Sequence, residues 1–382
     1  MYPHTINIDW LQIYLHDENQ GIENLAMIYN GKSSYEFKKA EYTSRQFSQV
    51  YDIYDSDGDH YAVLQRIPFS NIISYDGAIL KLANRELYKS TMIDTLILFL
   101  EYHRFAFKSI SRLDICFDSN TLKNGLKHST LIRGLQNGKY LKNNQGQAKQ
   151  NFEVQSKTNR IMECNSISFG SLSSAVKTKM YNKTKEMNDV KYKPYIVESW
   201  QKNGIDTNKD VWRIEISIKA DMTNIVKLDT GETFRLTTDR LKLSTDIQNI
   251  FYTYAARYFS FKINDGKKNK TRMPSLEIFP ERSIITSQPI RITLQNDESR
   301  SDKIFLNKLH RIQVELRNID DNTLSAIEEV RRAFCIATGL SKYYNKKIRI
   351  KTKEENNKHF IKKNKYYETT TINRLRRKEL SF

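Results

Sequence analysis

Three segments with a strict alternation of residue character limit what this chain can fold into. They are 112–118 (RLDICFD), 169–183 (FGSLSSAVKTKMYNK) and 212–219 (WRIEISIK). A period of two is typical of β-strands that bury one face, so each segment is predicted to contain a strand. One face of the middle strand would carry three lysines and a tyrosine: Lys177, Lys179, Lys183 and Tyr181. The protein is therefore predicted to contain a sheet with an ionisable face.

Acidic residues occupy the flanking strands on either side of this tyrosine. Asp114 and Asp118 share a face of the first strand, and Glu215 shares a face of the last strand with Arg213. If the strands are neighbours, two or three carboxylates would hold a hard divalent cation beside a tyrosine nucleophile. The lysines would bind phosphate and favour the phenolate form of Tyr181. A tyrosine nucleophile beside a metal is the chemistry of a DNA-nicking enzyme. The alternative is structural: alternating lysines also occur on solvated strand faces, and acids at strand ends also serve as ion-pair partners.

The basic charge of the chain is concentrated at one end. The net charge is +18, and residues 341–382 hold 14 Lys/Arg against 4 Asp/Glu, a net of +10. Residues 1–60 hold 4 Lys/Arg against 10 Asp/Glu, a net of −6. Aromatic residues are interleaved with the basic ones in the tail, a pattern that suits backbone tracking and base stacking. The tail is predicted to bind duplex DNA through its phosphates, with a solvated, partly disordered extension as the alternative.

The remaining composition predicts a cytoplasmic protein that does not enter a membrane. The longest apolar run, 92–99, contains Asp94 and is much shorter than a membrane span, and the first residues show no secretory signal. Cys116, Cys164 and Cys335 are scattered, which favours reduced thiols over a disulfide framework or a zinc site. No two of the seven histidines stand two residues apart, so a metal would rest on carboxylates, which suits Mg²⁺ or Mn²⁺.

The pattern along the chain predicts an α+β fold with a largely antiparallel sheet backed by helices. Helices are expected over 91–107, within 237–261 and over 321–339, and 186–210 is expected to be a long polar insertion. The further expected strands are 6–15, 48–54, 60–67, 77–83, 152–169 and 175–183. The predicted domains are a catalytic domain over 1–222, a helix-rich basic region over 223–340 and the tail over 341–382.

The motifs resemble those of rolling-circle replication initiators of the Rep_trans type. The resemblance rests on Arg112-Leu113-Asp114 with Asp118, Phe169-Gly170 with Ser174, Tyr181-Asn182-Lys183, and Trp212-Arg213-Ile214-Glu215. It implies that Tyr181 is the nucleophile and that Asp114, Asp118 and Glu215 are metal ligands. Lys177, Lys179, Lys183 and Arg213 are the expected phosphate-binding residues. The implied partner is origin DNA, single-stranded or extruded at the nick site, together with a second copy of the chain and a host helicase.

The predicted reaction is nicking by transesterification, which leaves a 5′-phosphotyrosine and a free 3′-OH and can later rejoin the ends. A mobilisation relaxase of a conjugative element would use the same chemistry. A non-catalytic DNA-binding protein would keep the basic tail without needing Tyr181 near carboxylates. An integrase or topoisomerase would need an Arg/His cluster around its tyrosine, which the sequence does not show.

Overall fold

A computed structural model describes residues 3–19, 21–69, 75–143, 150–156, 162–171, 173–280, 287–291, 305, 309 and 321–337. The chain divides into two compact units, Met1–Ile292 and Thr293–Phe382. In the second unit the structure describes helix α8 (Asp321–Ala337), which confirms the helix predicted at 321–339. The basic tail over 341–382 lies outside the described residues, so its role stays a prediction.

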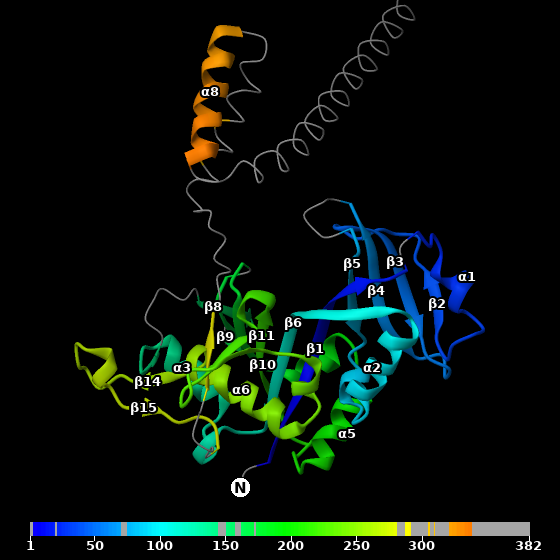
Figure 1. The fold of residues 1–382 in the computed structure, drawn as a ribbon. Helices are drawn as coiled ribbons and strands as arrows, with labels where there is room; N and C mark the ends of the chain where they lie inside the picture. The colour runs from blue at the N-terminus through cyan, green and yellow to red at the C-terminus, as the bar shows by residue number, and fades with distance from the viewer. Residues whose placement is uncertain are drawn as a thin grey trace, which may run out of the picture. The chain divides into compact units, whose positions relative to one another are not determined.

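Ten of the described strands form one large antiparallel sheet in the first unit (Figure 1). Its order is β2-β3-β4-β5-β1-β6-β11-β10-β9-β8. The strands are β1 (His4–Asp17), β2 (Glu36–Lys39), β3 (Phe47–Tyr54), β4 (His60–Pro68), β5 (Gly77–Leu82), β6 (Phe105–Ser119), β8 (Gln150–Ser156), β9 (Met162–Phe169), β10 (Val176–Asn182) and β11 (Trp212–Lys219). The α+β class and the antiparallel sheet predicted from the alternation are confirmed.

Two long strands join the halves of this sheet. The second half of β1 pairs with β5, from Gln12 to His16, while β6 pairs along nearly the whole of β1. The second half of β6, from Arg112 to Ser119, pairs in turn with β11. The strands that carry the three motifs, β6, β11 and β10, are therefore consecutive neighbours. This confirms the predicted adjacency of the Asp114 and Glu215 strands.

The helices and two small sheets surround the large sheet. The helices are α1 (Leu25–Tyr29), α2 (Met92–Tyr102), α3 (His128–Gln136), α4 (Lys183–Asp189), α5 (Pro194–Lys202) and α6 (Ser244–Tyr258). Short 3-10 helices are η1 (Glu86–Tyr88), η2 (Lys123–Gly125), η3 (Ala220–Met222), η4 (Thr238–Leu241) and η5 (Lys270–Arg272). The small sheets contain β12 (Asn224–Lys227), β13 (Thr233–Arg235) and β16 (Ser287–Ile290), and β7 (Tyr140–Lys142), β14 (Phe261–Ile263) and β15 (Ser275–Leu276).

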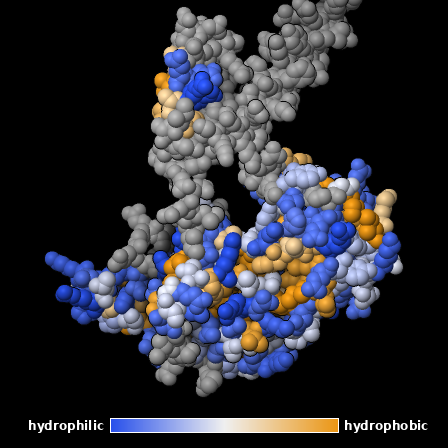
Figure 2. Space-filling view, viewed as in Figure 1, coloured by the Kyte–Doolittle hydropathy of each residue, from blue (hydrophilic) through white to orange (hydrophobic). Residues whose placement is uncertain are grey.

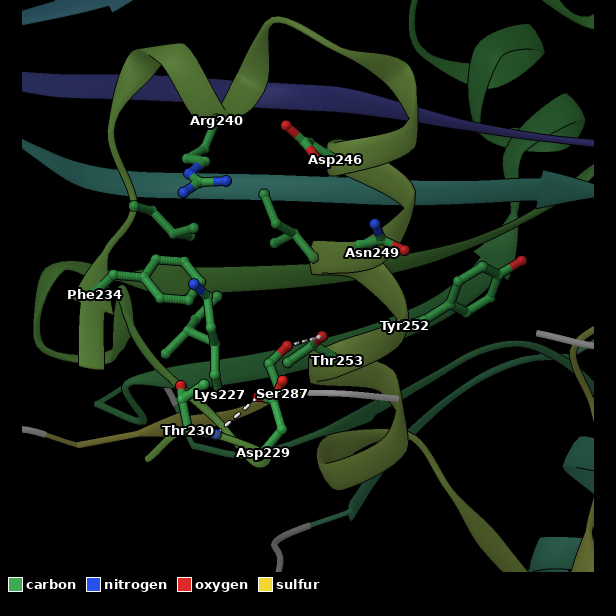
Figure 3. Close-up of a pocket in the computed structure, with 13 residues that line it drawn as sticks. Lys227, Asp229, Thr230, Phe234, Arg240, Asp246, Asn249, Tyr252, Thr253 and Ser287 are labelled. Carbon is green, nitrogen blue, oxygen red and sulfur yellow. Dashed lines mark hydrogen bonds between the residues drawn. The ribbon is translucent and has the colours of Figure 1, made fainter. Parts of the chain in front are cut away.

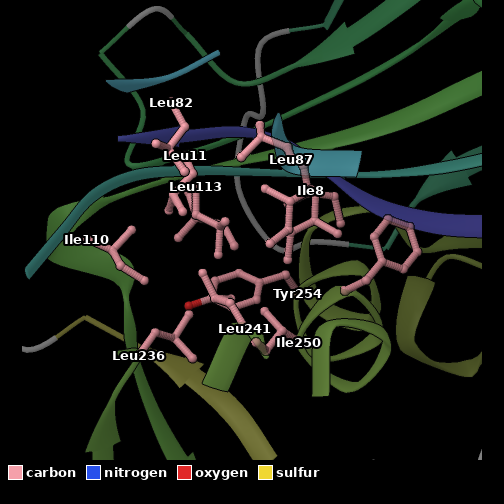
Figure 4. Packing of buried hydrophobic residues seen from close by; sticks show 14 of the residues in the cluster. Ile8, Leu11, Leu82, Leu87, Ile110, Leu113, Leu236, Leu241, Ile250 and Tyr254 are labelled. Carbon is pink, nitrogen blue, oxygen red and sulfur yellow. The ribbon is translucent and has the colours of Figure 1, made fainter. Parts of the chain in front are cut away.

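The hydrophobic core lies between the apolar face of the sheet and α6. Figure 4 shows side chains of β1 and β6, such as Ile8 and Leu113, meeting Ile250 and Tyr254 of α6. The hydroxyl of Tyr254 donates to the carbonyl of Met222, so this ring fills the core while its polar atom stays paired. Because α6 packs on strands of the predicted catalytic domain, the compact unit runs past the boundary placed at 222. The division of functions between 1–222 and 223–340 stays a prediction.

Three local expectations are corrected. The helix predicted over 91–107 ends at Tyr102, because Arg104 takes a positive φ of 57° and turns the chain into β6. The strand predicted over 152–169 is a pair, β8 and β9, that forms its own hairpin pairing. The segment 186–210 is not a polar insertion. It contains α5 and most of α4. Together with Val211, it forms a small hydrophobic core of Met187, Ile196, Trp200, Ile205 and Val211.

Candidate active site

The strand register places the motif residues on one face of the large sheet. Residues paired across neighbouring antiparallel strands share a face. Tyr181 pairs with Arg213, and Lys179 pairs with Glu215. On the other side of β11, Arg213 pairs with Asp118, and Glu215 pairs with Cys116. We call this side of β6, β11 and β10 the polar face; its members are Asp114, Cys116, Asp118, Lys177, Lys179, Tyr181, Arg213, Glu215 and Ser217.

The side chain of Tyr181 is held between a carboxylate and two ammonium groups. Its hydroxyl donates a hydrogen bond of 3.2 Å to Oε2 of Glu215. The Nζ atoms of Lys179 and Lys183 lie 4.9 and 5.6 Å from the centre of its ring. Tyr181 is therefore fixed on a strand, beside an acceptor for its proton.

The pKa of Tyr181 corrects the expectation that the phenolate form is favoured. Burial raises this pKa well above its ordinary value, and the nearby Glu215 raises it further, while Arg213 lowers it. The hydroxyl is therefore protonated in this state of the site. Its activation requires transfer of the proton to a base, and the carboxylate of Glu215 is in hydrogen-bonding distance.

Three carboxylates interact electrostatically beside the tyrosine: Asp9, Asp114 and Glu215, here called the acidic cluster. Burial raises the pKa of Glu215 to about 7, and the charges of Asp9 and Asp114 add to this rise. Burial also raises the pKa of Asp114, although Arg112 donates two hydrogen bonds to its carboxylate. Burial also acts to raise the pKa of Asp9. The positive charges of Arg213 and Lys183 lower it, and the resulting pKa of Asp9 is about 2.

Asp9 is the functional candidate that the sequence reasoning missed. The expected face of the first strand placed Ile8 and Trp10 together, but the pairing of β1 with β6 is irregular between these two residues. Ile8 pairs with Ile115 of the apolar face, whereas Trp10 pairs with Asp114 of the polar face. Asp9 is the extra residue of this bulge, which turns its carboxylate toward the polar face. Its position as the one charged residue of the segment INIDWL was the available signal.

Arg213 holds the acidic side chains together and does not reach solvent. It is fully buried, and its guanidinium donates to both oxygens of Asp118, at 2.8 and 2.7 Å. It also donates to Asp9 and, at 3.0 Å, to the hydroxyl of Tyr88. These partners take four of the five N–H donors of a guanidinium that is fully buried, so phosphate binding by Arg213 stays a prediction that the burial does not favour. The buried guanidinium instead fixes the geometry of the site.

Asp118 is similarly committed to partners within the protein. Its Oδ2 atom also accepts a hydrogen bond of 2.8 Å from the indole nitrogen of Trp200 on α5. As a metal ligand, Asp118 would have to give up Arg213 or Trp200. The predicted role of Asp118 at a metal stays a prediction, and Asp114 and Glu215 are better placed for it.

The Tyr-Asn-Lys motif joins the site to the helices that follow. The side chain of Asn182 accepts from the backbone nitrogen of Lys185 at 2.9 Å, which caps α4, and donates to Asp210 at 2.9 Å. Lys183 is buried and forms an ion pair of 2.6 Å with Glu186. Lys183 therefore acts on the electrostatics of Tyr181 from beneath the surface. Lys177 and Lys179 are half-buried on the polar face and stay the predicted phosphate-binding residues.

The Phe-Gly-x-x-x-Ser motif is explained by the turn between β9 and β10. Gly170 has a φ of 97°, a conformation that side-chain-bearing residues rarely adopt. A Cβ atom at this position would lie 3.2 Å from the carbonyl oxygen of Val176. The hydroxyl of Ser174 accepts from the backbone nitrogen of Ser171 at 2.9 Å and closes the turn. The motif thus fixes the register of β10, on which Tyr181 lies.

The donor set of the acidic cluster suits a hard divalent cation, since all its ligands are carboxylate oxygens. Burial, together with the neighbouring carboxylates, raises the pKa of Asp114 and of Glu215, so a bound cation would favour their charged forms. In the described ranges, no three His, Cys, Asp or Glu side chains already converge at metal-ligand spacing. The cluster therefore has the right chemistry for Mg²⁺ or Mn²⁺, and Asp114 would have to exchange hydrogen bonds with Arg112 to bind one.

A separate cavity of about 510 Å³ lies between the β13-β12-β16 sheet and α6 (Figure 3). The ring of Phe234 is flanked there by Lys227 and Arg240, whose charged groups lie 5.9 and 5.3 Å from its centre. None of its lining residues belongs to the polar face, so this cavity is not part of the candidate active site.

Comparison with known proteins gives likenesses among solved structures alone. No protein-family model matches the chain, and no curated protein matches it. Among solved structures, the chain is similar to a rolling circle replication initiator protein from Geobacillus stearothermophilus. The identity is 16%, the TM-score is 0.45, and the match covers 72% of this chain and 93% of the other. Separately, no helix in the described part of the chain is long and apolar enough to cross a membrane.

Proposed function

We propose that this protein is a DNA-nicking and joining enzyme that initiates rolling-circle replication, with Tyr181 as its nucleophile. The observation that carries the proposal is the hydrogen bond from the Tyr181 hydroxyl to Glu215, inside a cluster of carboxylates and next to lysines. A tyrosine that only filled a sheet would not need an acidic acceptor at that position. A mobilisation relaxase would use the same site, and the genes that flank the coding sequence distinguish the two functions.

The reaction exchanges one phosphodiester for another. The phenolic oxygen of Tyr181 attacks the scissile phosphorus, and the bond between that phosphorus and the 3′ oxygen of the preceding nucleotide breaks. Glu215 accepts the phenolic proton, and solvent water supplies the proton that the departing 3′ oxygen takes up to become the 3′-OH. The products are a 5′-phosphotyrosine and a free 3′-OH. Because the bond types are the same on both sides, the reverse reaction can rejoin ends without ATP.

The neighbouring cations favour the charge distribution of this step. Lys179 and Lys183 lie over the ring of Tyr181, so their charges stabilise the phenolate as it forms and the phosphate as it approaches. Lys177, further along the same face of β10, is proposed to bind a flanking phosphate. Arg213 holds Asp9 and Asp118 in place and does not bind DNA itself.

A Mg²⁺ or Mn²⁺ ion would be held by carboxylate oxygens of Asp9, Asp114 and Glu215. When bound, it would polarise a non-bridging oxygen of the scissile phosphate.

The rival classes fit the site less well. A non-catalytic DNA-binding protein leaves the buried tyrosine–carboxylate pair without a purpose. An integrase or topoisomerase would surround the tyrosine with Arg and His, whereas its hydrogen-bond partner is Glu215 and the one neighbouring arginine is committed to Asp118.

The test is incubation of the purified protein with Mg²⁺ and a supercoiled plasmid that carries the DNA flanking its own coding sequence. The proposal expects a relaxed, singly nicked product with protein attached to the 5′ end, and no such product from Tyr181→Phe. Binding without cleavage under both Mg²⁺ and Mn²⁺ would contradict it.

A further inference from the structure

A groove of about 940 Å³ lies beside the candidate active site, at the N-terminal end of β1. Its walls come from β1, η1 and the residues after it, the start of α2, α5, η4 and the start of α6. Its volume is at the upper end of the range of about 300–1,000 Å³ that is usual for ligand sites. The groove is therefore large for a small metabolite and suits a longer ligand.

Two tyrosines that line the groove also belong to the hydrogen-bond network around Arg213 and Asp9. Tyr88 lines the groove, and its hydroxyl accepts a hydrogen bond from Arg213 at 3.0 Å. Tyr195 also lines it and donates at 2.8 Å to Asn84, which in turn donates to Asp9. A ligand in this groove would thus be separated from the acidic cluster by one layer of side chains.

The lining combines basic side chains with apolar ones. The basic lining residues are Arg85, Lys89, Lys202 and Lys242, and the acidic one is Glu198. Arg85, Lys89 and Lys242 form ion pairs with Asp59, Glu86 and Asp94, which lie outside the lining. Lys202 is exposed and forms no ion pair within the described part of the chain. Apolar surface is offered by Leu243, whose side chain is 58% exposed, and by the partly exposed Ile247 and the ring of Tyr195, while Ile6, Ile8 and Leu87 close the groove from the core.

We propose that this groove binds single-stranded DNA that flanks the nick site. The proposal rests on the proposed function. Grooves that bind unpaired strands combine cations, which follow the phosphates, with apolar or aromatic side chains that contact the bases. Lys202 contacts a phosphate, and Leu243 and the ring of Tyr195 contact bases. A duplex hides its base faces by stacking, so it cannot use the apolar floor in this way.

The first experiment measures binding of a fluorescein-labelled single-stranded oligonucleotide of mixed sequence to the full-length protein by anisotropy, over a range of salt concentrations. The test variants are Lys202→Gln and Leu243→Ser. The matched controls are Lys108→Gln, an exposed lysine on the part of β6 that pairs with the far end of β1, and Leu98→Ser, an exposed leucine of α2. All four variants change exposed side chains, and thermal melts verify that each is folded.

We expect each test variant to weaken single-strand binding about five- to tenfold, because Lys202→Gln removes a phosphate contact and Leu243→Ser removes a base contact. Lys202→Gln also lowers the slope of log affinity against log salt by about 0.7. The controls bind as the wild type does, and binding to the matched duplex changes less than twofold in every variant. Test variants that bind the single strand normally, or that lose duplex binding equally, overturn the proposal.

Photocrosslinking with an oligonucleotide that contains 5-iododeoxyuridine gives a second readout. Crosslinked peptides from 85–93, 195–203 or 241–248 support the groove, and crosslinks confined to other segments overturn it. The outcome is independent of the nicking assay. If the protein cuts DNA through Tyr181 but the variants bind normally, only the groove proposal fails. If binding depends on the groove but no cleavage occurs, the proposed function fails and the groove stands.

Discussion

The hydroxyl of Tyr181 and the carboxylate of Glu215 meet at 3.2 Å although 34 residues separate them in the chain. Their strands, β10 and β11, are antiparallel neighbours, and Glu215 pairs with Lys179, two residues before the tyrosine. This diagonal arrangement places a proton acceptor at the phenol and a cation above its ring. The predictions below test what each part of that arrangement contributes.

Glu215→Gln should slow nicking about 10²- to 10⁴-fold, because the amide keeps a hydrogen-bond acceptor but cannot take the phenolic proton. DNA binding measured without Mg²⁺ should change less than twofold, since no basic side chain is removed. Single-turnover cleavage of supercoiled DNA and anisotropy measure the two quantities. Glu101→Gln, the same change at an exposed residue of α2, is the matched control. A Glu215→Gln variant that cuts at the wild-type rate would exclude a role as the base.

Trp200→Phe should lower the free energy of unfolding by about 1–3 kcal/mol, because the buried carboxylate of Asp118 loses a donor. The nicking rate should fall as well, since Asp118 positions Arg213. Denaturant unfolding and the cleavage assay check the two effects. Tyr192→Phe is the control, as Tyr192 is exposed between α4 and α5. Unchanged stability would mean that α5 is not anchored through Asp118.

The stability of the first unit should fall in mild acid because of His128. Burial lowers the pKa of this histidine from 6.5 to about 3, and its ring stacks on Trp212. Above pH 6.5, His128 is unprotonated in both the folded and the unfolded protein. Below pH 6.5, His128 is protonated in the unfolded chain but stays unprotonated in the folded protein. The histidine therefore costs about 2 kcal/mol of stability between about pH 7.5 and about pH 5.

Urea unfolding at the two pH values measures this loss in the wild type and in His128→Gln. The variant is less stable at neutral pH. Its free energy of unfolding should fall by about 2 kcal/mol less than that of the wild type between the two pH values. Equal pH dependence in both proteins would show that His128 is protonated in the folded state or is not buried.

Affinity for duplex DNA should depend on the basic tail. Removal of the residues after Gly339 deletes the net +10 of 341–382 and should flatten the salt dependence of duplex binding. A second basic surface, at the connection between β14 and β15, contains Lys267, Lys268, Lys270 and Arg272 and forms the hydrophilic tip at the left of Figure 2. Lys268→Gln in the full-length chain is the comparison. An unchanged salt slope after truncation would make the tail a solubilising extension only.

The sequence predicted the strands of the site because alternation is a local signal. Periodicity in β6, β10 and β11 was enough to place Tyr181, Glu215 and Asp114 on one face. The role of Asp9 could not be predicted in this way, because the bulge after Ile8 changes which residues share a face.

The burial of individual side chains could not be predicted from the local sequence pattern either. Arg213 looks like a phosphate-binding residue in the sequence WRIEIS, yet Asp118 and Asp9 surround it. Trp200 stands in a polar segment, and its value as an anchor depends on a carboxylate 82 residues earlier in the chain. Such contacts are set by tertiary packing, so they became visible only with the fold.

Peptide mapping of the covalent protein–DNA adduct tests the central claim most directly. The wild-type protein is reacted with supercoiled DNA and Mg²⁺, digested with nuclease and protease, and the modified tyrosine is identified by mass spectrometry. Tyr181→Phe and Tyr195→Phe are run in parallel, since Tyr195 is near the site through its hydrogen bond to Asn84. We predict nucleotide attached at Tyr181 alone, no adduct in Tyr181→Phe, and a normal adduct in Tyr195→Phe. An adduct at Tyr195, or cleavage that persists in Tyr181→Phe, would contradict the assignment of Tyr181 as the nucleophile.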